Sequence, residues 1–472
     1  MLSKEEVGQL LSRESVQKAL YTALRNGGNF AEVFVEKKLS NSISLEEGRI
    51  ERVKTGFDLG AGIRVVNGEG VSYVFTDDLA EEALLEAARL AGSAARNATH
   101  RTAVLDLRPH RNPSPHRISI RPETVAKAGK VELVMRADRA ARAVDPQIKQ
   151  VMVGYADSVQ KVIIANSEGL WAEDERVHTR MAVTAVAARG EVIQTGYEAP
   201  GKHMGLELFD HFPPEEIGRT AGRRAVTMLN ARPAPSGKMA VVISNGFGGA
   251  MFHEASGHGL EADFIQKGSS VFAGRIGEQV ASPLVTAIDD GTLVNEWGSF
   301  VVDDEGAPAQ RTVLIENGVL KSYMYDRKAA VKDKRPSTGN GRRESYQDLP
   351  LPRMTNTFIA PGESTPEEII AATPDGLFAK VLSGGEVNPA TGDFVFVVSE
   401  GYLIKDGKIT EPVRGATLIG NGPESLQKID MVGNDLVFSA GMCGKGGQSI
   451  PVSVGQPTLR MAELTVGGTQ RE

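Results

Sequence analysis

The sequence has a single cysteine, Cys443, among 472 residues. One cysteine excludes an internal disulfide framework, and it excludes a zinc site built from four cysteines of one chain. A chain without disulfides suits a reducing compartment, so we expect a cytoplasmic protein. No apolar run approaches the roughly 18 residues that a membrane-spanning helix needs. Residues 1–20 lack the apolar core and cleavage site of a secretory signal. We therefore expect no membrane association.

An excess of positive charge is also missing. Lysine and arginine number 53 against 60 acidic residues, a net charge of −7, which argues against direct binding of nucleic acid. Glycine, by contrast, is abundant: 52 of the 472 residues are glycine, a larger fraction than the average of about 7%. The glycines are not periodic and fall between short apolar runs, which indicates many strands joined by tight turns.

Shifts in composition divide the chain into blocks. A stretch with four prolines and several arginines separates the first two blocks, and its three histidines have no ligand-like spacing, so we expect them in solvent. A second proline-rich stretch precedes the last block. The predicted division is an N-terminal α/β domain (1–96), a linker (97–122), a middle α/β block (123–232) and a β-rich domain (236–472).

Apolar spacing predicts the elements of these blocks. Recurrence at three and four residues indicates helices over 4–26, 79–95 and about 125–143. The last block reads mostly as strands, including one over 298–303, and its polar, arginine-rich segment 333–353 reads as an extended loop. The predicted fold class is α+β, with an N-terminal α/β region followed by a large, mostly antiparallel β-rich domain.

A candidate metal motif lies in residues 244–259, which follow a strand and open a helical pattern. It reads His253-Glu254-x-x-x-His258, whereas zinc proteases place their histidines about 40° apart with His-Glu-x-x-His. The longer spacing puts the two histidines about 140° apart on a regular α-helix, too far to share a metal. Two geometries remove this obstacle. A π-type turn aligns residues i and i+5; alternatively, the helix ends at Gly257 and His258 returns from the first loop residue.

A catalytic metal needs a third protein ligand and an open position. Cys443 lies among glycines, and six of the eight histidines precede residue 212, which leaves His253 and His258 in the rest of the chain. A His₂Cys site with Glu254 as base is chemically consistent, because a metal lowers the pKa of bound water to about 7 and Glu254 can accept its proton. Two alternatives stay open for Cys443: a buried apolar side chain or a Cys–His nucleophilic pair.

Four polar residues are weaker candidates. Glu261 and Asp263 are either second-layer partners that orient a histidine or ordinary surface acids. Arg342 and Arg343 either bind a peptide carboxylate from a loop that reaches over the site or belong to a solvated loop.

A glycine pair is a further candidate. Gly384 and Gly385 precede a strand that either accepts a peptide as an added strand or follows an ordinary turn. Asn245–Gly249, although glycine-rich, does not fit the dinucleotide-binding fingerprint.

From Asn245 onward the chain resembles the TldD/PmbA family of metallopeptidases, and one N-terminal segment extends the resemblance over nearly the whole sequence. The TldD type keeps the metal motif and the PmbA (TldE) type has lost it, so this chain resembles the TldD type. The segments that carry the resemblance are HEASGHGLEAD (253–263), PSTGNG (336–341), SGGEV (383–387), TGDF (391–394), the loop around Cys443, and GAGIRV (60–65).

The resemblance implies a zinc peptidase with His253, His258 and Cys443 as ligands and Glu254 as general base. It implies one zinc per chain, although iron stays open. It also implies that the substrates are short or unfolded peptides, including leader peptides of modified peptide products. The implied assembly is a homodimer, or a heterodimer with a metal-free PmbA/TldE-type subunit. Two rivals remain: a non-enzymatic regulator or assembly partner, such as a gyrase modulator, and a metal-dependent amidase.

Overall fold

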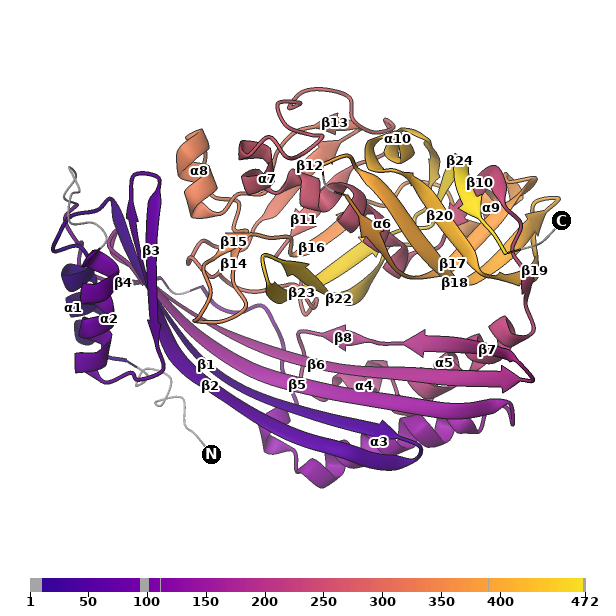
Figure 1. The fold of residues 1–472 in the computed structure, drawn as a ribbon, viewed down its shortest axis with the longest axis horizontal. Coiled ribbons are helices and arrows are strands. Elements are labelled where there is room, and N and C mark those ends of the chain that lie inside the picture. Colours follow the sequence, from indigo (N-terminus) through magenta and orange to yellow (C-terminus); the bar gives the residue numbers. More distant parts are fainter. Residues whose placement is uncertain (1–10, 94–101, 111, 389, 470–472) are drawn as a thin grey trace.

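The computed structural model describes residues 11–93, 102–110, 112–388 and 390–469. Long, curved strands extend beneath the C-terminal domain, and the first two helices lie at one end of the molecule (Figure 1). The helix predicted over 4–26 is described from Arg13, since residues 1–10 lie outside the described part. The fold class predicted from the sequence, α+β with a mostly antiparallel C-terminal domain, is confirmed.

The long strands form one sheet. In spatial order it contains β3 (Gly70–Thr76), β2 (Arg49–Asn67), β1 (Phe30–Glu46), β5 (Ile148–Asn166), β6 (Leu170–Arg189) and β4 (Arg108–His110), with β7 (Val192–Glu198) and β8 (Gly201–Lys202) also paired to β6. Strands β1 and β2 pair antiparallel from Phe30↔Val66 to Glu46↔Arg49. Because β1 pairs with β5, this sheet joins the blocks predicted over 1–96 and 123–232.

Helices cover this sheet at its two ends. At one end α1 (Arg13–Ala23) and α2 (Glu81–Ser93) enclose a core that includes Val33 and Ile63. At the other end α3 (Lys127–Arg142) and α5 (Pro214–Leu229) cover Val153 and Val183. Alternate residues of a strand point to opposite faces, so the second face of the sheet is left toward the C-terminal domain. The short connecting helices are η2 (Pro122–Thr124) and α4 (Leu208–His211).

The C-terminal domain contains a closed barrel and a second sheet. The barrel order is β17 (Asp375–Val387), β10 (Gly237–Ile243), β24 (Leu459–Gly467), β20 (Ala416–Asn421) and β18 (Asp393–Lys405), and β18 pairs back to β17. The strands β19 (Lys408–Arg414), β9 (Arg232–Pro233) and β21 (Ile429–Val432) extend it. The second sheet follows the order β13 (Val319–Leu320), β12 (Arg311–Glu316), β11 (Ala287–Asp290), β16 (Asn356–Ile359), β23 (Gln448–Gln456) and β22 (Val437–Lys445).

Short elements complete this domain: the pair β14 (Gly341–Arg342) and β15 (Leu351–Pro352), and the helices α8 (Arg327–Asp333), α9 (Pro366–Ala371) and α10 (Gly422–Gln427). None of the helices in the described residues is both long and apolar enough to cross a membrane.

Two local predictions differ from the structure. Residues 298–303 form no regular strand; Val302 makes one isolated bridge to Pro308, and the apolar side chains that suggested a strand are buried between the domains. Of the linker histidines expected in solvent, His110 is exposed, but the ring of His116 stacks on that of His203, with 4.1 Å between ring centroids. His100 lies outside the described residues.

Candidate metal centre

The candidate site begins where the barrel strand β10 ends. From there the chain forms a continuous helical path through η3 (Gly246–Gly249), α6 (Ala250–Phe252), η4 (His253–Gly257) and η5 (His258–Leu260). Small residues allow this path to lie deep in the domain: a Cβ on Gly249 would lie 2.7 Å from the backbone of Gly455 in β23. The absence of a side chain therefore lets this helical path rest directly against the second sheet.

The segment His253–Gly257 is a π-helix, which is the first of the two geometries considered for the motif. The backbone N–H of His258 donates to the carbonyl of His253, five residues earlier. Because a π turn holds about one residue more than an α turn, positions i and i+5 come into line. The two imidazole rings consequently lie next to each other in an edge-to-face arrangement, with 5.1 Å between centroids and 83° between planes.

Cys443 reaches the two histidines from strand β22. Its Sγ lies 3.3 Å from His253 Nε2 and 3.4 Å from His258 Nε2. All three donor atoms lie within 4.8 Å of one another, and all three residues are buried. The structure thus brings together two segments that are about 190 residues apart in the sequence.

Glu261 orients one of these histidines. Its Oε2 lies 3.0 Å from His258 Nδ1 and 2.9 Å from Lys445 Nζ. In the neutral form of His258, which is the form that binds a metal, a proton on Nδ1 directed at this carboxylate leaves the Nε2 lone pair on the side of Cys443 Sγ. Asp263 lies one step farther away, because it accepts from Lys445 at 2.6 Å rather than from a histidine.

The charges of the cluster depend on one another. Burial opposes ionisation of Cys443, but the two imidazoles beside Sγ lower the pKa of its thiol to about 4. Burial likewise acts against the charge on Glu261, but His258 and Lys445 lower the pKa of that carboxyl to about 2. Burial acts to lower the pKa of His258, yet Glu261 and Cys443 raise that pKa well above its ordinary value. The cysteine is therefore a thiolate, the form that binds metals.

Glu254 occupies a different position from the three donors. Its Oε2 is 3.8 Å from His258 Nε2, and its side chain is 37% exposed, whereas the side chain of His258 is 10% exposed. The carboxylate therefore borders the donor atoms on a side that water can reach.

The predicted arginine pair is placed differently from the expectation. The loop 333–353 docks on the N-terminal sheet instead of reaching over the cluster: Tyr346 N–H donates to Glu36, and Tyr73 donates to the carbonyl of Tyr346. Arg343 is buried in an ion pair with Glu32 of β1, and Arg342 is buried and donates to the carbonyl of Met354. The reason for the difference is charge pairing, because the N-terminal sheet carries buried acids that match Arg343.

The glycine pair lies in the second half of β17. The register between β17 and β18 shifts between Leu382 and Gly385, and Gly384 has a φ of +105°, a region that favours glycine. A Cβ on Gly385 would lie 2.4 Å from the ring of Phe396. Both glycines are thus explained by a bulge and a close contact, and their part in peptide binding stays a prediction.

Two residues near the cluster were not singled out from the sequence. Lys445 contacts Glu261 and Asp263, and Arg353 is fully buried and donates to the backbone carbonyl of Cys443. A signal existed for Lys445, since residues i and i+2 of a strand share a face and Cys443 lies two residues earlier. No comparable signal existed for Arg353, 90 residues away in sequence.

The donor set fits a metal ion. One thiolate and two imidazole nitrogens converge, and a carboxylate fixes one ring. Zinc prefers sulfur and nitrogen ligands in a tetrahedral arrangement, and catalytic zinc keeps one of four positions open. Three protein donors beside the partly exposed Glu254 match that pattern.

Comparison with known proteins agrees with this geometry. Models of the PmbA/TldA metallopeptidase match three parts of the chain: domain 1 over residues 31–95, the central domain over 120–229 and the C-terminal domain over 236–468. The chain belongs to the TldD/PmbA metallopeptidase family. Within it, the metalloprotease TldD homolog of Haemophilus influenzae is 40% identical over 449 residues, which cover 93% of each protein.

Solved structures with a similar fold are also found. A Thermotoga maritima protein named for modulation of a DNA gyrase superposes with a TM-score of 0.79 at 24% identity, over 96% of this chain and 99% of its own. TldE from Thermococcus kodakarensis gives a TM-score of 0.77 at 21% identity, over 96% of this chain and 100% of its own. At this level of identity both likenesses establish the fold.

Proposed function

We propose that this chain is a zinc-dependent peptidase that hydrolyses short or unfolded peptides. The observation that carries the proposal is the convergence of His253, His258 and Cys443, whose donor atoms lie within 4.8 Å of one another. Family membership supports the reaction class, because the matching relatives are named metalloproteases.

In this proposal His253, His258 and Cys443 hold one zinc ion per chain. Imidazole together with thiolate favours zinc, and iron is the alternative. A bound zinc ion supplies a Lewis acid that polarises a peptide carbonyl and lowers the pKa of water to about 7. Glu261 positions His258 through Nδ1, and Asp263 acts more remotely by holding Lys445.

Glu254 is the proposed general base. Its carboxylate borders the donor atoms without joining them, at 3.8 Å from His258 Nε2. From there Glu254 accepts the proton of the attacking water and passes it to the leaving amine. The partial exposure of this side chain keeps it within reach of both.

Burial of the donors supports the proposed substrate class. Because the three donors are almost fully covered by the fold, a peptide bond in a rigid domain cannot reach them. We therefore assign unstructured peptides as substrates, and Gly384 and Gly385 remain proposed contacts. Efficient cleavage of a stable globular protein would contradict this assignment.

Metal analysis of the purified chain tests the ligand set. We expect about one zinc per chain in the parent and its loss in His258→Ala and Cys443→Ser. His211→Ala is the matched control, because His211 is an exposed histidine outside the cluster. Metal retained in Cys443→Ser would require another third ligand, and no metal in the parent would favour the regulator.

A screen of unstructured peptides and small amides distinguishes the remaining functions. A peptidase cleaves internal peptide bonds, a metal-dependent amidase acts only on the small amides, and a regulator cleaves neither. The alternative function outside the enzymes is a gyrase modulator. A protein that only binds a partner does not need three metal-binding side chains to converge. We also propose that the chain works in the cytoplasm. We propose that it acts either as a homodimer or with a PmbA/TldE-type subunit, and the mass of the purified chain in solution tests whether it forms a homodimer.

A further inference from the structure

A separate polar pocket lies on the opposite face of the β22–β23 hairpin from the cysteine sulfur. Met442, Ser449, Ile450 and Pro451 of the hairpin contribute to its lining, and the pair Met442 and Pro451 alternates with Cys443 along the strands. The pocket has a volume of about 260 Å³. Since one water occupies roughly 30 Å³ in the liquid, this space accepts a group of several heavy atoms.

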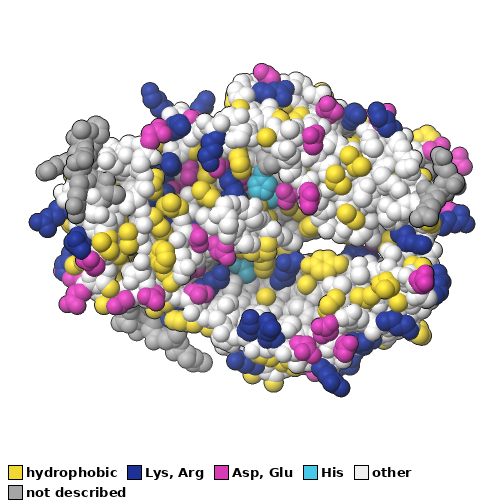
Figure 2. Space-filling view, in the orientation of Figure 1, with side chains coloured by type: hydrophobic (Ala, Val, Ile, Leu, Met, Phe, Trp, Pro, Cys, Tyr) yellow, Lys and Arg dark blue, Asp and Glu magenta, His cyan; other side chains and the backbone are white. Residues whose placement is uncertain are grey.

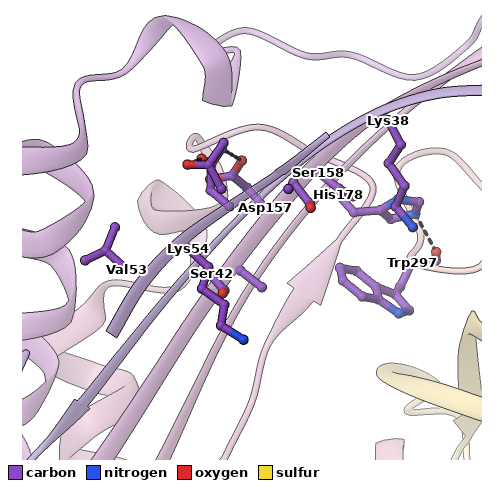
Figure 3. A pocket seen from close by; sticks show the side chains of 13 residues that line it. Lys38, Ser42, Val53, Lys54, Asp157, Ser158, His178 and Trp297 are labelled. Atoms are coloured by element: carbon purple, nitrogen blue, oxygen red, sulfur yellow. Dashed lines mark hydrogen bonds between the residues drawn. The ribbon is translucent and has the colours of Figure 1, made fainter. Parts of the chain in front are cut away.

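This pocket continues into a larger one along the long-stranded sheet. The second pocket has a volume of about 640 Å³, and Lys38, Ser158, His178 and Trp297 line both. Figure 3 shows Lys38, His178 and Trp297 gathered at one side of the larger pocket. The molecular surface is hollowed between this sheet and the C-terminal domain (Figure 2). The two pockets therefore form one groove between the domains.

Four cations line the smaller pocket, and two of them are neutralised by the fold. Arg176 is paired with Asp174 and Asp304, and Arg343 is paired with Glu32. Lys38 and Arg342 differ, because among the described residues neither forms an ion pair with a carboxylate; Asp304 and Glu344 also line the pocket, and Asp304 acts on Arg342 from beyond ion-pair distance. The pocket thus holds two positive charges without a direct counterion.

Arg342 is the unusual member of this set. It is 5% exposed, Nη1 donates to the carbonyl of Met354, and Nε is buried without a hydrogen-bond partner. Burial lowers the pKa of Arg342 to about 10, so the guanidinium remains charged near neutral pH. A buried charge without a partner is costly, and such groups are normally paired or bind an ion.

The neighbouring neutral groups are suited to a peptide. His178 Nε2 lies 3.0 Å from the carbonyl of Trp297, which places the ring proton on Nε2 and leaves Nδ1 as an acceptor. Burial lowers the pKa of His178 to about 3, so the ring stays neutral. Ser158 adds a hydroxyl at the same junction of the two pockets.

We propose that this pocket binds a carboxylate of the peptide, with Arg342 and Lys38 as its cationic ligands. The proposal rests on the proposed peptidase function and adds an anchoring site apart from the metal cluster. A guanidinium presents several N–H donors in a planar fork that matches a carboxylate, and charge-assisted bonds of this kind are strong. The carboxylate belongs either to the peptide C-terminus or to an acidic side chain.

Binding to a catalytically disabled chain tests this site without requiring cleavage. The full-length Glu254→Gln protein is titrated with fluorescent pentapeptides of one sequence in three forms: free C-terminus without acids, amidated C-terminus with one glutamate, and amidated without acids. We expect at least one carboxylate form to bind roughly tenfold to a hundredfold more tightly than the third, as expected for hydrogen bonds to a charged group. The form that gains affinity identifies the source of the carboxylate.

Second-site variants assign that gain to the pocket. Arg342→Met and Lys38→Met, each added to Glu254→Gln, are expected to reduce the preference for the carboxylate form. Arg335→Met is the matched control, since Arg335 is exposed in the same segment. Thermal unfolding of each variant establishes that it is folded.

The outcomes separate this proposal from the peptidase assignment. Equal affinity for all three peptides, or a preference that persists in folded Arg342→Met, overturns the carboxylate site while leaving cleavage by the parent untouched. If Arg342→Met does not fold, Lys38→Met and competition by free acetate decide the question. A parent that cleaves no peptide but retains the carboxylate preference overturns the peptidase and leaves the anion site.

Discussion

One ammonium group connects the two halves of the candidate metal centre. Lys445 Nζ contacts Glu261 at 2.9 Å, Asp263 at 2.6 Å and the carbonyl of Pro352 at 3.0 Å. Glu261 in turn contacts His258, whereas Lys445 lies two residues from Cys443 on the same strand. Through these contacts, the distance between Cys443 and His258 depends on the position of the Lys445 side chain.

Replacing this lysine is expected to weaken metal binding. In Lys445→Met the Glu261 carboxylate loses its second partner, so it holds the ring of His258 less firmly. Loss of such outer partners typically costs 10- to 100-fold in metal affinity. Competition with a chromophoric chelator measures the change. Lys267→Met is the control, because Lys267 is exposed and lies 3.9 Å from the same Asp263. A purely structural lysine would instead lower the unfolding temperature of the metal-free chain with the metal affinity unchanged.

Replacing Glu254, the glutamate beside the donor atoms, is expected to lower peptide cleavage without weakening metal binding. Glu254→Gln keeps the shape of the side chain and removes the base, so metal content should stay near one ion per chain. Peptide cleavage should fall about 10²- to 10⁴-fold, the usual contribution of general acid–base catalysis. Glu363→Gln, at an exposed position, should change neither quantity. An active Glu254→Gln protein would remove this residue from the mechanism.

The π turn shows what a short motif can and cannot specify. The spacing of His253 and His258 conflicts with a regular α-helix. A π turn is one of two geometries that remove the conflict, and it is the one that the structure has. The spacing could not choose between the two geometries, because the choice depends on packing: a Cβ on Gly257 would lie 2.4 Å from Sδ of Met354, a residue 97 positions later. Local sequence does not contain that neighbour.

Helix α8 carries a titratable cap. Asp326 accepts from the backbone N–H of Ala329 at 2.7 Å, which satisfies one of the free donors of the first turn. Burial and the nearby Glu305 raise the pKa of Asp326 to about 7, while Arg64 acts to lower it. Asp326 is therefore protonated in the folded chain over a pH range in which the unfolded chain is ionised.

This cap makes stability depend on pH with a defined sign. A folded pKa above the unfolded value gives stability that is complete below about pH 4 and is lost as the pH rises through about 7. Asp326→Asn retains a capping group but does not titrate. Between pH 5 and pH 8 the parent should lose about 2–3 kcal/mol more unfolding free energy than the variant. Denaturant unfolding at both pH values measures this, and Asp375→Asn, at an exposed strand end, should follow the parent.

Sequence patterns predicted local elements better than their connections. Helices over 79–95 and 125–143 correspond to α2 and α3, because apolar spacing on one face is a local signal. The long strand β5 runs unbroken from Ile148 to Asn166, although polar residues lie in its middle. These polar residues are paired: Asp157 accepts from the buried Lys130. A long-range partner of this kind is not visible in the strand itself.

The arrangement of the whole molecule depends on buried charges between domains. Glu32 on β1 binds both Arg64 of β2 and Arg343 of the C-terminal domain, and Arg64 also contacts Glu305. All four side chains are almost completely buried. The predicted division puts Glu32 and Arg64 in one block and Glu305 and Arg343 in another, so the contacts between the two pairs could not be predicted from the sequence.

The two adjacent arginines should therefore respond differently to the same substitution. Arg343→Met leaves Glu32 with one cation instead of two, and breaking a buried ion pair from one side typically costs 3–5 kcal/mol. Arg342→Met removes a charge that has no carboxylate partner, so it should cost less. Because Arg343 joins β1 to the C-terminal domain, its loss should also speed amide hydrogen exchange along β1 and β2. Exchange measured by mass spectrometry, with exposed Arg335→Met as control, checks this. Equal effects of Arg342→Met and Arg343→Met would show that size rather than charge pairing holds the domains together.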